Sequence, residues 1–192
     1  MAIKLIALDL DGTLLTSDKK ITTRTKDIIA RAMSRGVTVT IATGRMLRSA
    51  LYFVRLLASD APVICCNGGY VGKEKGAPVF ARYFDPALVR EFLTFAYERG
   101  WYVNWYIGTE IYAPEYREEY FTAYRTTAHF IVNAVGNDYL GYTENVPQFV
   151  LREMDTGIGA YVRAVQEHFG AQLVPQQNTG TSVDINPPGV NK

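Results

Sequence analysis

The chain has 192 residues, of which 48% are hydrophobic and 20% are charged, with a formal net charge of +1. This length suits one sizeable domain or two small ones, and the near-neutral charge gives no support for a nucleic-acid or membrane-surface partner. No run is long and apolar enough to span a bilayer. The apolar N-terminal stretch carries Lys4, Asp9 and Asp11, so it is not a signal peptide. The adjacent Cys65 and Cys66 would point to opposite faces of a strand, so we expect reduced thiols in a cytoplasmic protein.

The first third of the sequence alternates predicted strands and helices. Short apolar and β-branched runs predict three buried strands, at residues 3–8, 37–42 and 62–66. The helical spacing of apolar residues predicts two helices between them, at residues 22–35 and 46–58. Thr22 or Thr23 can cap the first helix, and Gly36 follows its end. Strands separated by single helices predict right-handed βαβ units and a parallel sheet.

The pattern changes to α+β after this region. Residues 69–84 resemble a hairpin, and Asp85-Pro86 is typical of an N-cap followed by the first residue of a helix that runs to about Arg99. Further strands are expected at residues 101–107, 110–113, 148–153, 171–174 and 181–185, and further helices at 116–127 and 155–170. The stretch 128–147 is ambiguous.

The most specific pattern is Asp9-x-Asp11-Gly12-Thr13, at the end of the first predicted strand. Residues i and i+2 of a strand point the same way, and open α/β sheets bind ligands at the carboxyl ends of their strands. Two neighbouring carboxylates repel each other unless a cation or a shared proton relieves them. This layout favours metal-assisted phosphoryl transfer. The alternative is that both aspartates merely cap a turn, since Asp-Gly is a common turn dipeptide.

This pattern resembles the first motif of the haloacid dehalogenase superfamily, in which the first Asp is a nucleophile, the second a general acid/base, and Mg2+ completes the site. The segments 42–45, 67–68 and 184–192 resemble, in order, those of the Cof-type, C2-capped sugar-phosphatase-like branch. The resemblance implies an α/β fold with a Rossmann-like core and a parallel sheet, and an α+β cap. Its implied domain boundaries are core residues 1–81, cap residues 82–187 and a return to the core at 188–192.

The resemblance also implies roles for single residues. Asp9 would be the nucleophile and a metal ligand. Asp11 would protonate the leaving oxygen and then activate water, and its backbone carbonyl would reach Mg2+. Thr43 and Gly44 would bind phosphate at the start of the second helix, although Thr43 alone reads as a helix cap. Lys192 would pair with the nucleophile and the phosphate, although a terminal lysine alone reads as a solvated tail.

Three further residues are candidates for substrate binding. Arg45 has a guanidinium suited to bidentate contacts, but a solvated surface arginine explains it equally well. Asn67 and Gly68 line the site or form only a turn. The many aromatic residues between 101 and 124 are expected to pack the second domain, with one or two of them available to a substrate.

The implied function is Mg2+-dependent hydrolysis of a small phosphorylated metabolite, such as a sugar phosphate, through an aspartyl-phosphate. The family's later acidic motif, which supplies further metal ligands, has no match here. The core sheet then has three parallel strands, with the Asp9 strand at or near an edge, where an apolar strand is a pairing liability. We therefore expect a C-terminally truncated form of low activity. The alternatives are a phosphomutase of the same fold and a non-catalytic relative that binds ligands or partners.

Overall fold

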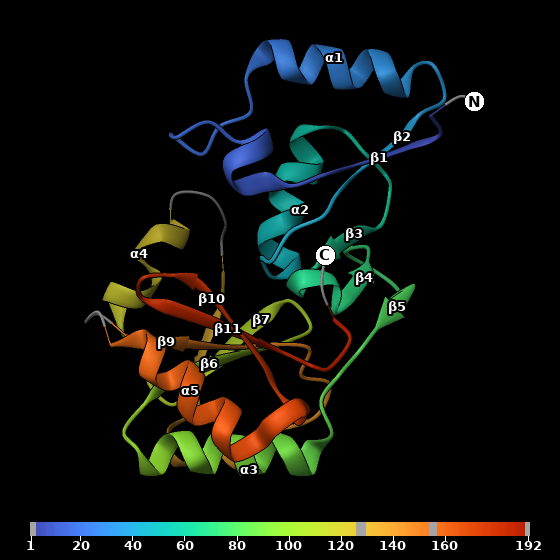
Figure 1. Ribbon diagram of the computed structural model, residues 1–192. Coiled ribbons are helices and arrows are strands. Elements are labelled where there is room, and N and C mark those ends of the chain that lie inside the picture. Colours follow the sequence, from blue (N-terminus) through green and yellow to red (C-terminus); the bar gives the residue numbers. More distant parts are fainter. Residues whose placement is uncertain (1–2, 126–129, 154–156, 191–192) are drawn as a thin grey trace. The chain divides into compact units, whose positions relative to one another are not determined.

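The computed structural model describes residues 3–125, 130–153 and 157–190 (Figure 1). The contacts between residues fall into two groups, which divide the chain into two compact units. The first unit extends to Ala81, and the second comprises Arg82–Arg125 and Phe130–Val190. The predicted α/β class is confirmed. None of the described helices is long and apolar enough to cross a membrane.

The first unit contains the predicted parallel strands. Strands β1 (Leu5–Leu8) and β2 (Thr38–Ile41) pair in parallel along their whole length. A single parallel bridge then joins Ala42 to Ile64 of β3 (Val63–Cys65). The hairpin predicted after β3 is present, because β4 pairs antiparallel with β5 on one side and with β3 on the other, in the order β3-β4-β5. Their bounds are Tyr70–Gly72 and Phe80–Ala81.

The two helices of this unit begin and end close to their predicted bounds. Helix α1 is Thr23–Met33, and the Thr22 hydroxyl caps it by accepting a hydrogen bond from the Thr25 amide at 3.1 Å. Helix α2 is Leu47–Leu56 and starts after Met46, which offers no side-chain cap. Two short helical turns lie at the carboxyl ends of β1 and β3, at Leu10–Leu14 and Cys66–Gly68.

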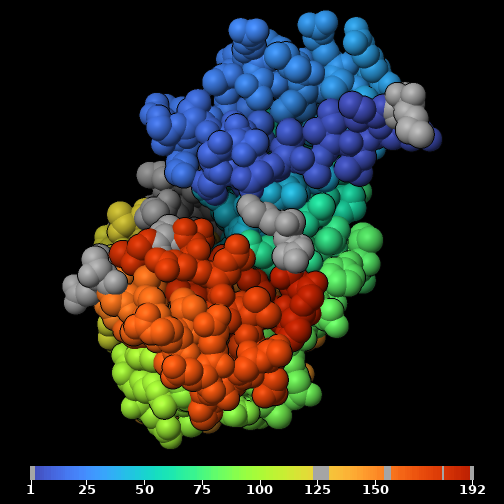
Figure 2. All heavy atoms as spheres, viewed as in Figure 1, coloured from blue at the N-terminus to red at the C-terminus, as the bar shows by residue number. Residues whose placement is uncertain are grey.

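The prediction that the first strand is buried is wrong. Leu5 is 57% exposed and the preceding Ile3 is 71% exposed, whereas Val39 and Ile41 on β2 are almost fully buried. Figure 2 shows the dark blue atoms of this segment at the surface of the first unit. A parallel strand is buried when it has neighbours at both edges and helices on both faces, but β1 pairs only with β2 in the part of the chain that the structure describes.

The second unit contains a six-stranded sheet, and two helices share a hydrophobic core with one of its faces. The strand order is β10-β11-β9-β6-β7-β8, and only the β7–β8 pair is parallel. Helices α3 (Pro86–Glu98) and α5 (Ile158–Phe169) contribute Phe92 and Phe169 to a core that includes Trp105 and Phe149 from the sheet. The strands are β6 (Tyr102–Ile107), β7 (Glu110–Ala113), β8 (Val132–Ala134), β9 (Phe149–Arg152), β10 (Val174–Thr179) and β11 (Ser182–Asn186).

Several predicted bounds in this unit need correction. The predicted strand at residues 171–174 is wrong, because Gly170–Gln172 is a short helical turn and β10 begins only at Val174. The polar residues of β10 occupy the edge of the sheet, so its position has no apolar signal. The ambiguous stretch holds β8 and a turn at Gly136–Gly141. Helix α4 is Glu118–Arg125, and the predicted helix start at Asp155 lies outside the described residues.

Candidate active site

The three segments that carry the motifs meet at one rim of the first unit. The parallel pairing of β1 with β2 brings Leu8 opposite Ile41. The Ala42 amide then donates to the Leu8 carbonyl at 2.8 Å, and the Thr43 amide donates to the Ile64 carbonyl at 2.9 Å. The residues that follow β1, β2 and β3 therefore leave the sheet side by side, at the carboxyl ends where α/β sheets bind ligands.

Asp9 and Asp11 lie directly after β1, on either side of a fully buried Leu10. Asp9 has an extended backbone and is half-buried, and its carboxylate accepts a hydrogen bond from the Thr13 hydroxyl at 3.4 Å. Its carbonyl accepts from the Leu14 amide at 3.1 Å, which closes the turn. Leu10 is thus part of the core, whereas the side chain of Asp11 is 43% exposed.

The carboxylate of Asp11 is held by two cations. Arg45 makes a bidentate contact, with Nε 2.8 Å from Oδ2 and Nη2 2.8 Å from Oδ1. The Nζ atom of Lys19 lies 2.7 Å from Oδ1. Partial burial by itself would raise the pKa of Asp11, but the hydrogen bonds and charges of Arg45 and Lys19 outweigh it and lower the pKa from 3.8 to about 2. Asp11 is therefore a carboxylate at neutral pH.

Arg45 is not the solvated surface arginine that the sequence left open. Its side chain is only 16% exposed. Besides the pair with Asp11, its Nη1 lies 3.4 Å from the hydroxyl of the buried Ser49, and its guanidinium lies 5.2 Å from the ring centre of Phe53. Both partners are on α2, so the helix fixes the direction of the arginine toward Asp11.

Lys19 was missed by the sequence analysis. It lies in the loop between the first motif and α1, and its backbone is left-handed with φ of +58°. That conformation is uncommon for a residue other than glycine. It turns the lysine back toward Asp11, eight positions earlier in the chain. A lysine in a polar loop carries no sequence signal for such a contact.

Thr43 is almost fully buried at 2% exposure and lies before α2, as predicted. The alternative reading of Thr43 as the helix cap is wrong, because α2 begins at Leu47 after Met46, and the Thr43 hydroxyl instead accepts from the Arg45 amide at 3.2 Å. Residues 42–46 form a loop that backbone hydrogen bonds tie to β3 and to the turn after it. The free amides of the helix start therefore do not lie directly beside Thr43.

The Asn67-Gly68 turn packs against this loop. The Asn67 amide donates to the Thr43 carbonyl at 3.2 Å, and the Cys66 amide donates to the Arg45 carbonyl at 3.0 Å. A β-carbon added to Gly44 would lie 2.6 Å from Oδ1 of Asn67. The position of Gly44 thus requires glycine, because the asparagine side chain occupies the space that a larger residue needs.

The same turn has unusual backbone geometry. Cys66, Asn67 and Gly68 have φ of +51°, +55° and +94°. Glycine and asparagine tolerate this region, but cysteine does so at a cost of about 1–2 kcal/mol. The two hydrogen bonds to Thr43 and Arg45 offset that cost. Strained backbone of this kind concentrates at functional sites, which adds support to this rim as the candidate site.

The candidate metal ligands are few. The described residues contain no group of three or more His, Cys, Asp and Glu side chains placed to hold a metal. Mg2+ is normally held by one or two protein carboxylates together with water and substrate phosphate oxygens. The Asp9 carboxylate and the Asp11 backbone carbonyl are hard oxygen donors of the right kind. The Asp11 carboxylate is already occupied by Arg45 and Lys19. Lys192 lies outside the described residues.

Comparison with known families agrees with the motifs. The model of the haloacid dehalogenase-like hydrolase family matches residues 6–192. The chain therefore belongs to the haloacid dehalogenase-like hydrolases, and the predicted resemblance is confirmed. A haloacid dehalogenase-like hydrolase from Bacteroides thetaiotaomicron has the same fold, with a TM-score of 0.87 over 98% of this chain and 73% of that chain, at 20% sequence identity.

Two curated relatives are phosphatases. Pyridoxal phosphate phosphatase YbhA from Escherichia coli (strain K12) is 45% identical over 71 residues, which cover 37% of this chain and 26% of that protein. The 5-amino-6-(5-phospho-D-ribitylamino)uracil phosphatase YwtE from Bacillus subtilis (strain 168) is 43% identical over 70 residues, which cover 35% of this chain and 23% of that protein. The matched segments span about a quarter of each relative.

Proposed function

We propose that the chain carries the nucleophile and phosphate-binding segments of a Mg2+-dependent phosphatase that acts on a small phosphorylated metabolite. The observation that carries this proposal is the meeting of Asp9, Asp11, the Thr43 loop and the Asn67 turn at one rim. In a member of the haloacid dehalogenase-like family, these segments are suited to binding a phosphate monoester. The two relatives named above are phosphatases of pyridoxal phosphate and of 5-amino-6-(5-phospho-D-ribitylamino)uracil, which supports a small phosphorylated substrate.

In the proposed reaction an Asp9 carboxylate oxygen attacks the phosphorus atom while the bond to the leaving oxygen breaks. Asp11 protonates that oxygen and then takes a proton from the water that cleaves the aspartyl-phosphate. A bound Mg2+, held by Asp9 and the Asp11 carbonyl, would neutralise charge on the phosphoryl oxygens. General acid catalysis accelerates a reaction by only about two to four orders of magnitude. Fixed hydrogen-bond donors around the phosphate must therefore supply much of the remaining rate acceleration.

The observed contacts of Asp11 place a condition on this mechanism. A carboxylate with a pKa of about 2 is not protonated at neutral pH, so it cannot donate a proton while Arg45 and Lys19 hold it. A phosphate dianion offers these cations an alternative partner of higher charge. We infer that substrate binding draws Arg45 away from Asp11. The negative phosphate then raises the pKa of the Asp11 carboxyl group, which takes up from solvent the proton that it donates to the leaving oxygen. Arg45 then pairs with the phosphate, as one of the substrate-binding residues that the sequence suggested.

Thr43 and Gly44 would bind the phosphate in this proposal, and Asn67 and Gly68 would shape the loop around it. The second unit would be a C2-type cap, and the first unit the catalytic core. The remaining sequence predictions, which are a cytoplasmic location, the absence of a nucleic-acid partner and the role of Lys192, stay predictions.

The test is a panel of phosphate esters that includes pyridoxal phosphate and sugar phosphates, with Mg2+ present and released phosphate measured. The matched control for Asp9→Asn is Asp27→Asn, which removes an exposed carboxylate from α1. We expect slow hydrolysis that Asp9→Asn abolishes and Asp27→Asn preserves. Hydrolysis that survives Asp9→Asn would contradict the assigned nucleophile. Transfer of phosphate to a second hydroxyl of the sugar, rather than to water, would instead favour the phosphomutase.

A second candidate function is ligand binding without turnover. The observation that favours it is the pairing of Asp11 with two cations in a site that, among the described residues, has no third acidic group nearby. In that case phosphate esters bind at the rim but are not hydrolysed. Calorimetric binding of a phosphate ester, weakened by Arg45→Gln and unaccompanied by phosphate release, would identify this function.

A further inference from the structure

A cavity lies in the first unit, at the opposite end of β3 from the candidate active site. It has a volume of about 330 Å3, at the lower end of the range of about 300–1,000 Å3 for small-molecule sites. Residues 59–61 of its lining precede β3, whereas the Asn67 turn follows it. Residues 73–75 follow β4, whose last residue, Gly72, pairs with the first residue of β3, Val63. The cavity is therefore separate from the Asp9 rim.

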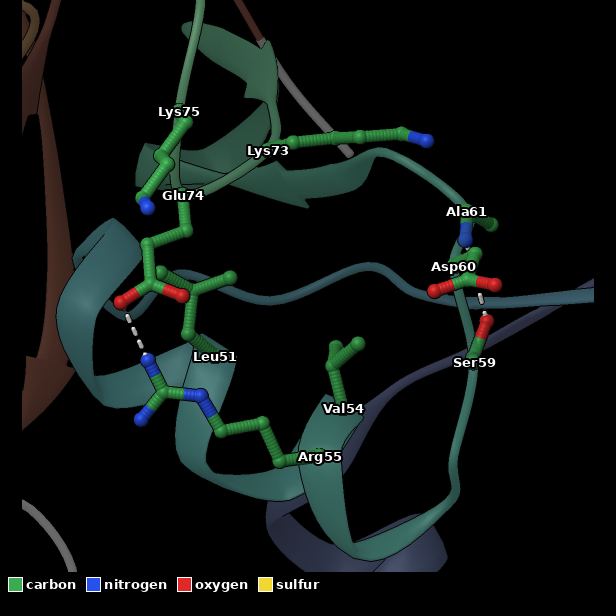
Figure 3. A pocket seen from close by; sticks show the side chains of 9 residues that line it. All are labelled: Leu51, Val54, Arg55, Ser59, Asp60, Ala61, Lys73, Glu74 and Lys75. Atoms are coloured by element: carbon green, nitrogen blue, oxygen red, sulfur yellow. Dashed lines mark hydrogen bonds and ion pairs between the residues drawn. The ribbon is translucent and has the colours of Figure 1, made fainter.

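The cavity has an apolar floor and a charged rim. Leu51 and Val54 of α2 form the floor, and they are only 8% and 6% exposed. Figure 3 shows Lys73 extending across one side of the cavity, and Asp60 on the segment before β3. Next to Asp60, the Ser59 hydroxyl accepts a hydrogen bond from the Ala61 amide at 3.2 Å.

The charges of the rim are unevenly paired. Arg55 and Glu74 form an ion pair across the cavity wall (Figure 3). The hydrogen bond from Arg55 lowers the pKa of Glu74, and the nearby Lys75 lowers it further. Within the described part of the chain, Lys73, Lys75 and Asp60 form no ion pair. The Lys75 ammonium lies on the side of Glu74, whereas Lys73 extends toward the other side (Figure 3). Lys73 and Asp60 are thus the charges available to a ligand above the apolar floor.

We propose that this cavity binds a small organic anion that also carries a hydrogen-bond donor at its far end, such as an amino acid or a hydroxy acid. The anionic group of the ligand pairs with Lys73. Its short aliphatic part covers Leu51 and Val54, which removes apolar surface from water. Its donor faces Asp60. A ligand with an anion at both ends is disfavoured, because the second anion meets the Asp60 carboxylate.

The test uses three probes of equal chain length that differ only at one end: 4-aminobutyrate, butyrate and succinate. Binding to the 192-residue chain is followed by NMR shifts of the backbone amides and of the Leu51 and Val54 methyl groups. We expect 4-aminobutyrate to bind most tightly and succinate most weakly. Binding should weaken as salt is raised, because exposed charges are screened.

Variants then test the residues. The variant Lys73→Gln should weaken 4-aminobutyrate binding about threefold, because it removes one exposed charge contact. Lys4→Gln, which alters an exposed lysine on another surface, should leave it unchanged. Asp60→Asn should remove the preference for 4-aminobutyrate over succinate.

Three outcomes would overturn the proposal: no shifts at these residues with any probe, binding that is equally tight in Lys73→Gln, or succinate binding as tightly as 4-aminobutyrate. Asp9→Asn should leave binding unchanged. If the chain shows no phosphatase activity but 4-aminobutyrate binds as expected, the proposed function fails and this inference is still supported.

Discussion

Replacing Asp11 with Asn should destabilise the protein at neutral pH by about 1 kcal/mol. The substitution removes the carboxylate that Arg45 and Lys19 hold. One pKa unit corresponds to about 1.4 kcal/mol, so the difference between the ordinary value of 3.8 and the value of about 2 corresponds to at most about 2.5 kcal/mol. The Asp11 side chain is 43% exposed and that of Lys19 is 49% exposed, so solvent screening reduces the effect to about 1 kcal/mol.

The pH dependence follows from the direction of the shift. The pKa of Asp11 is lower in the folded than in the unfolded protein, so its stabilising effect is complete above the unfolded value of 3.8 and is lost as the pH falls through about 2. Urea denaturation of the protein and of Asp11→Asn should therefore give a difference in the free energy of unfolding that is constant from pH 7 to about pH 5 and shrinks below that.

The control for this prediction is Asp27→Asn, which removes an exposed carboxylate from α1. A direct check is the NMR titration of the Asp11 carboxyl carbon. The midpoint of this titration should lie at a higher pH in Arg45→Gln than in the unaltered protein. The reasoning is refuted if Asp11 titrates near its ordinary value in the unaltered protein, or if Arg45→Gln leaves its titration unchanged.

Three further predictions concern other parts of the first unit. Gly44→Ala should lower the free energy of unfolding by about 1–3 kcal/mol, because its β-carbon would lie 2.6 Å from Oδ1 of Asn67. Thermal denaturation checks this, and Gly44→Ala combined with Asn67→Gly should recover part of the loss. Thr22→Ala should cost about 0.5–2 kcal/mol through loss of the α1 cap, whereas Thr22→Asp should retain most of the stability; equal loss in both would argue against the capping role. Chelation of Mg2+ by EDTA should abolish any hydrolysis of phosphate esters and added Mg2+ should restore it, and activity that is insensitive to EDTA would contradict the proposed metal dependence.

The local features of the fold could be predicted from the sequence, because they depend on residues that are close together in the chain. The cap at Thr22, the Asp85-Pro86 helix start and the hairpin after β3 all follow from residues within a few positions of one another. The strand predicted at residues 171–174 failed, because a polar edge strand such as β10 is defined by its pairing with β11 and not by its own composition.

The candidate site divides in the same way. The sequence by itself identified Asp9 and Asp11, the Thr43 loop and the Asn67 turn, because motif spacing and the carboxyl ends of parallel strands are properties of the chain order. Only the tertiary structure decided that Arg45 and Lys19 hold Asp11, that Gly44 makes room for Asn67, and that β1 is exposed. These features depend on side-chain directions and on what lies beside each element. Such contacts join residues far apart in the sequence, and no local pattern specifies them.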